Sequence, residues 1–237
     1  MATVDEVMEQ LKSKAKKDQL EGMARFAIVG DQRLGVSVPD MRKLAKDIGK
    51  DHQLALDLWD TGVPEAMIVA GMIAETEKLT EAQMEVWVVD INSWDICDQV
   101  CMNLFEKTPL AEKKIYEWSV REEEFVKRAS YALIACLAWH DKEASDEAFT
   151  QYFPVIVAGA TDERNFVKKA VNWALRNIGK RNQALNKEAI KVAKEIQGID
   201  SKSARWIASD TIRELESEKV QERLRKKAQQ SALPGSN

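Results

Sequence analysis

Hydrophobic residues recur along this 237-residue chain at spacings of three and four, the pattern of amphipathic helices rather than of alternating strands. In residues 162–182 one predicted helix side is apolar throughout, with Phe166, Val167, Ala170, Val171, Ala174, Leu175 and Ile178. We predict that this side is core. The opposite side carries a tryptophan in a row of cations, namely Lys169, Trp173, Arg176 and Lys180. A solvated helix would carry only polar groups there, so we expect Trp173 to contact a partner.

The pattern of residues 162–182 occurs a second time in the chain. Residues 122–129, Glu-Glu-Glu-Phe-Val-Lys-Arg-Ala, match residues 163–170, Glu-Arg-Asn-Phe-Val-Lys-Lys-Ala, at an offset of 41, so that Arg128 corresponds to Lys169. Repeats of roughly 40 to 47 residues made of paired helices are typical of HEAT-like solenoids. The alternative is a chance likeness between two amphipathic helices. We predict a single domain over residues 1–230, a right-handed stack of antiparallel helix pairs with a concave face, and a disordered tail over residues 231–237.

Caps and apolar stripes predict the remaining helices. Residues 3–18 should form one helix, capped by Thr3, with an apolar side made of Val4, Val7, Met8, Leu11 and Ala15. A basic helix that carries Arg42 and Lys43 should begin near Ser37, with Pro39 in its first turn. Further helices are expected at about 51–60, 64–75, 186–197 and 217–228 and after Thr80, with Trp59 in the core.

Composition supports the all-α class and indicates the cellular compartment in which we expect the protein. The chain has only 10 Gly and 5 Pro, and no run of alternating β-branched residues. Its apolar stretches fall short of the roughly 18 residues that span a bilayer, and its N-terminus lacks the features of a signal peptide, so we expect a soluble cytoplasmic protein. The three cysteines, Cys97, Cys101 and Cys136, should be buried thiols in a reducing compartment. His52 and His140 lie at no useful spacing from them, so no metal is predicted.

Charge is distributed unevenly along the chain. Residues 1–161 hold 18 Lys and Arg against 29 Asp and Glu, a net −11, whereas residues 162–237 hold 17 against 10, a net +7, which gives −4 overall. Contacts to phosphate depend on the cations that touch the backbone and not on the net total. The basic C-terminal third is therefore compatible with nucleic-acid binding, with Arg205 as one candidate contact. The cations of residues 217–228 are expected to form an ordinary solvated face.

Residues 90–106 contain the least ordinary combination of side chains. Asn92 or Ser93 should cap a helix on which Trp94 and Asp98 are neighbours at positions i and i+4. Asp98 falls at the border of the apolar side, where a carboxylate is partly desolvated unless it is paired. Spacing alone leaves two roles open for Asp98, a functional carboxylate or the structural partner of an arginine or a backbone amide.

The helix with the first copy of the repeat also carries candidate residues. Arg128 should stand outside the apolar stripe formed by Phe125, Val126, Ala129, Leu133 and Cys136. Trp139 and His140 end this helix. A lone histidine at a helix end is more often a surface residue or a partner of the helix dipole than a catalyst, so His140 receives no catalytic role.

Several pieces of the sequence, taken in order, resemble the AlkD-type family of DNA alkylation repair proteins, HEAT-like glycosylases for N3- and N7-alkylated purines. The likeness runs from residue 22 to about residue 215 and rests on Met23-Ala-Arg25, Leu34-Gly-Val-Ser-Val-Pro39, Ser93-Trp-Asp-Ile-Cys-Asp98, Val126-Lys-Arg-Ala129 and Phe166-Val-Lys-Lys-Ala-Val-Asn-Trp-Ala-Leu-Arg176. By position, the family's two active-site tryptophans fall on Trp94 and Trp173, its catalytic aspartate on Asp98 and its active-site arginine on Arg128. Ser93 stands where a family member has another tryptophan.

The resemblance implies a reaction that suits these residue types. A purine alkylated at N3 or N7 is cationic and leaves readily, so the enzyme needs mainly to stabilise an oxocarbenium-like sugar, the role implied for Asp98. Cation–π attraction at Trp94 and Trp173 would hold the charged nucleotide, and Arg128 would contact a phosphate. The nucleotide is expected to stay in the duplex, so no deep base pocket is expected.

The predicted partner is therefore double-stranded DNA with alkylated purines, bound by a nucleoid-associated monomer without cofactor or metal. The expected phosphate contacts are Lys169, Arg176, Lys180, Arg205, Arg42 and Lys43. Two alternatives stay open, a HEAT-like protein that binds damaged or branched DNA without chemistry, and a protein-binding solenoid. The intact Trp94 and Asp98 favour the enzyme over the first, and the basic C-terminal third favours DNA over the second.

Overall fold

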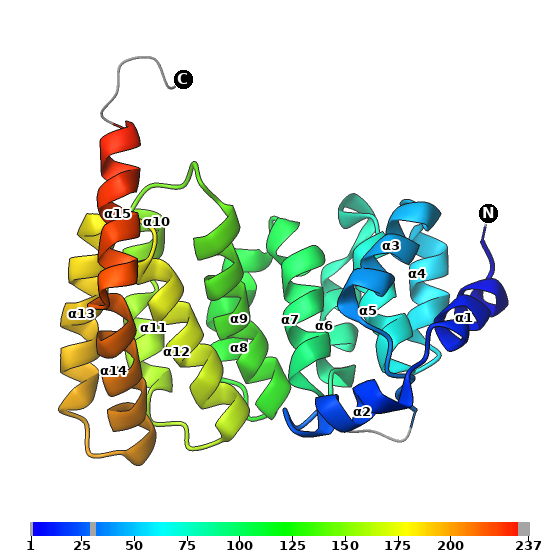
Figure 1. The fold of residues 1–237 in the computed structure, drawn as a ribbon, viewed down its shortest axis with the longest axis horizontal. Helices are drawn as coiled ribbons and strands as arrows, with labels where there is room; N and C mark the ends of the chain where they lie inside the picture. The colour runs from blue at the N-terminus through cyan, green and yellow to red at the C-terminus, as the bar shows by residue number, and fades with distance from the viewer. Residues whose placement is uncertain (1, 29–31, 232–237) are drawn as a thin grey trace. The chain divides into compact units, whose positions relative to one another are not determined.

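A computed structural model of the chain describes residues 2–28 and 32–231. Every regular element within these ranges is a helix (Figure 1), so the predicted all-α class is confirmed. None of the described helices is long and apolar enough to cross a bilayer. The chain divides into two compact units, residues 1–111 and 112–237. The single domain, the right-handed stack and the concave face stay predictions, and residues 232–237 of the predicted tail lie outside the described residues.

The N-terminal unit is a succession of short helices. The side chains at three predicted caps accept hydrogen bonds from backbone N–H groups. Thr3 forms a capping box with Glu6, and Ser37 and Thr80 cap the helices that follow them. Trp59 is a core residue, as predicted, and stacks on Trp87 with ring centroids 4.1 Å apart. The helices are α1 Val4–Ser13, α2 Lys17–Ala24, α3 Val38–Ile48, α4 His52–Trp59, α5 Pro64–Ile73, α6 Glu81–Asp90 and α7 Trp94–Asn103, with 3-10 turns η1 Thr76–Lys78 and η2 Phe105–Lys107.

The prediction of one helix over residues 3–18 is wrong. The chain leaves the helix at Lys14 and begins α2 at Lys17, after Lys16 in an extended conformation. The physical reason is that the apolar side ends at Leu11, because Ala15, which we had included in it, is exposed and buries nothing. Without an apolar contact to bury, the lysine-rich residues 14–17 gain little from continuing the helix.

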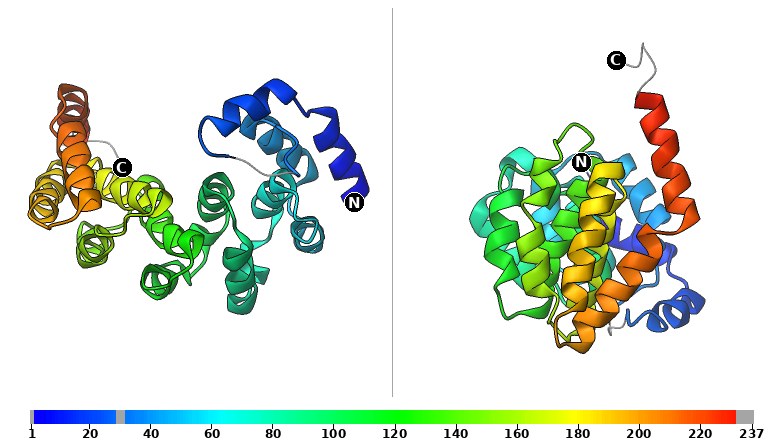
Figure 2. Two further views of the ribbon diagram at one scale, coloured as in Figure 1. Left: turned by 90° about the horizontal axis from the view of Figure 1, so that it is seen from below. Right: turned by 90° about the vertical axis from the view of Figure 1, so that its left-hand side faces the viewer.

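The C-terminal unit contains the longest of the described helices together with two short ones, and the left view of Figure 2 looks along several of them. The side chain of Asn182 accepts a hydrogen bond from the backbone N–H of Leu185 and caps the helix that begins at Gln183. This helix therefore starts three residues before the predicted residue 186. The helices are α8 Ala111–Ser119, whose first residue closes the N-terminal unit, α9 Glu124–His140, α10 Glu147–Thr150, α11 Phe153–Gly159, α12 Asn165–Gly179, α13 Gln183–Gln197, α14 Lys202–Leu215 and α15 Glu218–Ser231.

The two copies of the repeat pack against each other in register. Helices α9 and α12 lie side by side (Figure 1), and the equivalent rings of Phe125 and Phe166 meet with centroids 5.5 Å apart. Asn177 in α12 donates to the carbonyl of Ala135 in α9 at 3.0 Å, so the offset of about one repeat persists along both helices. The repeat found in the sequence therefore corresponds to neighbouring, equivalent helices. The three cysteines are buried free thiols, as predicted.

Gly159 should be intolerant of a side chain. A Cβ at this position would overlap the hydroxyl oxygen of Tyr131, whose side chain is itself buried. We expect Gly159→Ala to lower the free energy of unfolding by about 1–3 kcal/mol, measured by urea denaturation, because the buried ring must move. Gly22→Ala is the matched control, since a Cβ there meets nothing within 4 Å and alanine favours the helix. Equal stability of the two variants would contradict the tight contact.

Candidate functional site

Helix α7 presents Trp94 and Asp98 at the border of its buried side. The buried stripe consists of Ile96, Cys97, Val100 and Cys101, and both candidate side chains lie beside it, half-buried. A carboxylate in this position keeps access to a ligand while losing part of its hydration, which strengthens its interaction with a developing positive charge. The structure thus brings these two predicted residues together.

A buried arginine fixes the start of α7. Both terminal nitrogens of Arg33 contact the carboxylate of Asp95 at 2.7 Å, and Nη2 also donates to the Ser93 hydroxyl at 2.7 Å. Ser93 in turn donates to Asp95 at 2.8 Å. Ser93 occupies the predicted N-cap position, but its hydroxyl is used in this network instead of capping a backbone N–H. The serine that departs from the family pattern therefore has a structural partner in Arg33.

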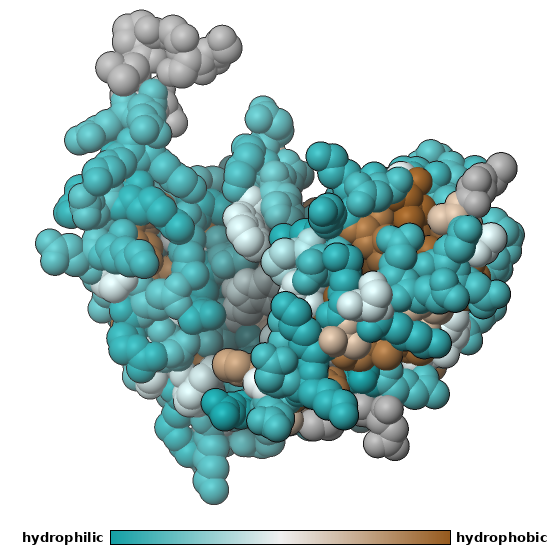
Figure 3. All heavy atoms as spheres, turned by 45° about the vertical axis from the view of Figure 1, so that its right-hand side comes forward, coloured by the Kyte–Doolittle hydropathy of each residue, from teal (hydrophilic) through white to brown (hydrophobic). Residues whose placement is uncertain are grey.

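The indole of Trp94 is held by the segment that follows α2. Its indole N–H donates to the carbonyl of Phe26 at 2.9 Å, just after α2. Phe26 is 69% exposed, and the next residue, Ala27, has a positive φ of 57°. Figure 3 shows a mostly polar face on which apolar side chains gather over the part formed by the N-terminal helices. Phe26 is not among the predicted contact residues, because nothing in its spacing links it to Trp94.

Arg128 does not occupy the position predicted for it. Instead of standing outside the apolar stripe, its side chain is only 5% exposed, and Nη1 donates to the carbonyl of Phe166 at 2.6 Å. Its repeat equivalent, Lys169, is exposed. The physical reason is that α12 packs along α9 and covers the side of α9 that carries Arg128. The arginine thus serves at least to join the two equivalent helices.

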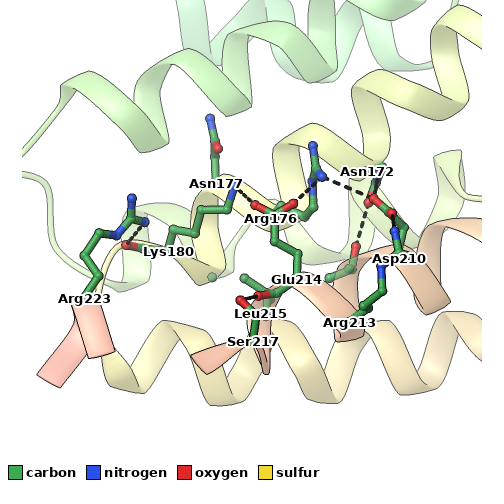
Figure 4. A network of polar contacts seen from close by, with 12 residues as sticks. Asn172, Arg176, Asn177, Lys180, Asp210, Arg213, Glu214, Leu215, Ser217 and Arg223 are labelled. Atoms are coloured by element: carbon green, nitrogen blue, oxygen red, sulfur yellow. Dashed lines mark hydrogen bonds and ion pairs between the residues drawn. The ribbon is translucent and has the colours of Figure 1, made fainter. Parts of the chain in front are cut away.

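The predicted cationic row of α12 is partly neutralised by α14. Figure 4 shows Arg176 and Lys180 directed toward carboxylates of α14: Arg176 lies 3.2 Å from Asp210 and also pairs with Glu214, which binds Lys180 as well. Asn172 donates to the same Asp210 carboxylate at 2.7 Å. These contacts fix the interface between the helices and reduce the positive charge that Arg176 and Lys180 can offer to phosphate.

The other predicted phosphate contacts are exposed. Arg42 and Lys43 lie on α3 of the N-terminal unit, and Lys169 lies on α12 of the C-terminal unit. Arg205 of α14 is exposed too, and pairs with Asp200 at 2.9 Å. A surface pair of this kind contributes little energy and can be exchanged for a phosphate contact.

Trp173 lines an open pocket of about 480 Å³ in the C-terminal unit. Lys180 lines it too, but most of its walls come from residues to which sequence analysis gave no site role, including Trp139, Lys142, Arg181, Arg223 and Lys227. The sequence contained a signal for Trp139 and Arg181. At the 41-residue offset of the repeat, Trp139 corresponds to Lys180 and His140 corresponds to Arg181.

The predicted site residues are thus divided between the units. Trp94 and Asp98 belong to the N-terminal unit, Arg128 and Trp173 to the C-terminal unit, and a joint role of the four stays a prediction. Within the described residues, no group of three or more His, Cys, Asp or Glu side chains could hold a metal ion.

These features define a class: an all-helical repeat protein with a carboxylate–tryptophan pair and cationic surfaces. Sequence comparison narrows it further, because the profile of the family described as DNA alkylation repair enzyme matches residues 7–215, most of the chain. The chain belongs to this family. No match to a curated protein was found.

A solved structure supports the predicted HEAT-like fold. It represents a family of proteins related to the HEAT-like repeat DNA glycosylases with affinity for branched DNA structures; it is 20% identical, covers 90% of this chain and 95% of its own, and has a TM-score of 0.73. A designed armadillo repeat protein also matches, at 15% identity over 83% of this chain and all of its own, with a TM-score of 0.37. The first of these confirms the HEAT-like fold.

Proposed function

We propose that this protein is an alkylpurine DNA glycosylase that removes cationic N3- or N7-alkylated purines from duplex DNA. The observation that carries the proposal is the placement of Trp94 and Asp98 together at the half-buried border of α7, in a chain of the DNA alkylation repair enzyme family. An N-glycosyl bond to a cationic purine breaks with the bonding electrons moving to the base, which leaves as a neutral molecule. No proton donor is needed, and positive charge develops on the sugar.

The residue roles follow from this chemistry. The carboxylate of Asp98 stabilises the oxocarbenium-like sugar and orients the water that adds to it, after which the added water loses a proton to solvent. The indole of Trp94 attracts the cationic nucleotide, and its bond to the Phe26 carbonyl holds it in one orientation. Trp173 is proposed to contact the nucleotide as well, and Arg128 to contact a phosphate.

Exposed cations supply the affinity for the DNA backbone in this proposal. We expect Lys169→Glu to weaken binding of a fully paired duplex at least about tenfold at low salt and to lower the slope of affinity against salt by at least about one. Lys191→Glu is the matched control, since Lys191 lies on α13, is exposed and pairs with Glu188 of its own helix, 3.9 Å away. Fluorescence anisotropy at several salt concentrations measures both quantities. Equal losses in the two variants would argue against a specific contact at Lys169.

The direct test of the proposed function is base release. Purified protein is incubated with duplex DNA that carries 7-methylguanine or 3-methyladenine, and the free base and the abasic site are quantified. Release above the spontaneous rate, with turnover, supports the proposal. Duplex binding without release at any enzyme concentration would refute it.

One observation favours a second candidate function. The similar solved structure represents proteins with affinity for branched DNA structures. In that alternative the same chain binds a DNA junction without chemistry. Tighter binding to a four-way junction than to a duplex, combined with no base release, is the result that would select it.

A further inference from the structure

The pocket of the C-terminal unit is built from three separate segments. The end of α9 with the loop after it supplies Trp139 and Lys142, the C-terminal half of α12 and the turn after it supply Trp173 and Arg181, and α15 supplies Arg223 and Lys227. Helix α15 lies beyond residues 7–215, the part that matches the family. The α15 wall is therefore a feature of this chain that family membership does not account for.

The walls of this pocket carry an excess of positive charge. They include five cationic side chains and, among the residues that the structure describes, one carboxylate, Asp146, which accepts a hydrogen bond from Asn182 at 2.6 Å. Lys180 is paired with Glu214 (Figure 4). In contrast, Lys142 donates to the carbonyl of Trp139, and Arg223 to the carbonyl of Lys180 at 3.5 Å. Backbone carbonyls orient these cations without cancelling their charge.

Arg181 is held rigidly in place. Its guanidinium donates to the carbonyls of Ala138 at 3.0 Å and Ala144 at 3.1 Å and also to that of Asp141, and it lies 3.8 Å from the centroid of the Phe149 ring. Burial lowers the pKa of Arg181, partly offset by Asp141 and Asp146. Burial also lowers the pKa of Lys227, and the neighbouring Arg223, Lys142 and Arg181 lower it further. Crowded cations of this kind are stabilised when an anion binds between them.

An exposed aromatic ring accompanies the cations. Trp139 is 53% exposed and stacks on His140 with ring centroids 5.0 Å apart, so the face of the indole that is turned away from His140 is open to a ligand. Trp173, half-buried, lines the same pocket. An indole next to cations matches a nucleotide, whose phosphate pairs with the cations while its base stacks on the ring. Paired bases in a duplex have their faces covered by neighbouring bases, so the base that stacks here must be unpaired.

We propose that this pocket binds an unpaired nucleotide of a DNA strand, with the phosphate between Arg181, Arg223 and Lys227 and the base against Trp139. The proposal rests on the DNA binding of the proposed function but not on base release. The proposal also separates the cations of residues 217–228 into those that face the pocket and those that do not. Arg223 and Lys227 face the pocket, whereas Lys226 pairs with Glu222 on α15 and Arg225 is exposed outside the pocket.

Two pairs of variants test the site with a labelled single-stranded oligonucleotide and a fully paired duplex of the same length. Arg223→Glu is compared with Arg225→Glu, the same change of charge on the same helix. Trp139→Ala is compared with Trp206→Ala, which removes another exposed tryptophan, one that lies under Lys168 instead of in the pocket. Circular dichroism checks that all four variants are folded.

We expect Arg223→Glu and Trp139→Ala each to weaken binding of the single strand on the order of tenfold, and their controls less than about threefold. Trp139→Ala should weaken binding of the duplex less than it weakens binding of the single strand. Equal losses in a variant and its control, or a larger loss on the duplex, would overturn the proposal. So would displacement of the oligonucleotide by micromolar deoxynucleoside monophosphate, which would identify a site for free nucleotides. A parent protein that never releases a base but shows the expected differences would refute the glycosylase and leave this inference intact.

Discussion

Asp98→Asn is expected to lower the rate of base release by at least about a hundredfold while the protein stays folded and binds duplex DNA. The amide keeps the volume of the carboxylate but not the negative charge that opposes the cation on the sugar, and loss of a single preorganised electrostatic contact has this magnitude. The measurement is single-turnover release of 7-methylguanine from duplex DNA, with duplex affinity and thermal unfolding measured on the same variant.

Asp95 has a structural role at the start of α7. The buried Arg33 is bound there by Asp95 and Ser93. Asp98 is half-buried, so replacing its charge should cost little stability.

Asp95→Asn is the matched control for this prediction, the same change on the same helix. It should lower the unfolding midpoint, and any loss of base release should follow the loss of folded protein. Base release by Asp98→Asn at the parent rate would refute the catalytic role. An unfolded Asp98→Asn would show that the carboxylate is structural.

Local sequence patterns predicted most of the helices and the pairing of two of them. The Phe125 and Phe166 segments match because equivalent helices must bury the same apolar side, and the structure places their rings in contact. The caps at Thr3, Ser37 and Thr80 were also readable, because each depends on a hydrogen bond within three residues. Features that depend on local hydrogen bonds or on a repeated apolar pattern could therefore be predicted from the sequence.

Burial and ion pairing could not be predicted from the sequence in the same way. Arg128 and Lys169 hold equivalent positions in the repeat, yet the first is buried and donates to the carbonyl of Phe166, whereas the second is exposed. Arg176 stands in a cationic row in the sequence, but its charge is compensated by residues 34 and 38 positions away. No periodicity encodes such contacts, since they are set by the packing of neighbouring helices.

Arg33→Met is expected to produce the largest loss of stability among the predicted variants. The side chain of Arg33 is buried and its guanidinium contacts both oxygens of Asp95 and the hydroxyl of Ser93. Methionine fills a similar volume but leaves the Asp95 carboxylate without its cation, a change that costs about 3–5 kcal/mol for a buried pair. The unfolding midpoint should fall by on the order of 10 °C for a chain of this size.

Arg42→Met is the control, because it makes the same chemical change at an exposed position of α3. A double variant, Arg33→Met with Asp95→Asn, should regain part of the lost stability, since the carboxylate left unpaired by the first change is then neutral. Equal midpoints for Arg33→Met and Arg42→Met would show that the network contributes nothing. If the double variant is as unstable as the sum of the two single variants, Arg33 and Asp95 act independently, and the start of α7, with Trp94 on it, is held by other contacts.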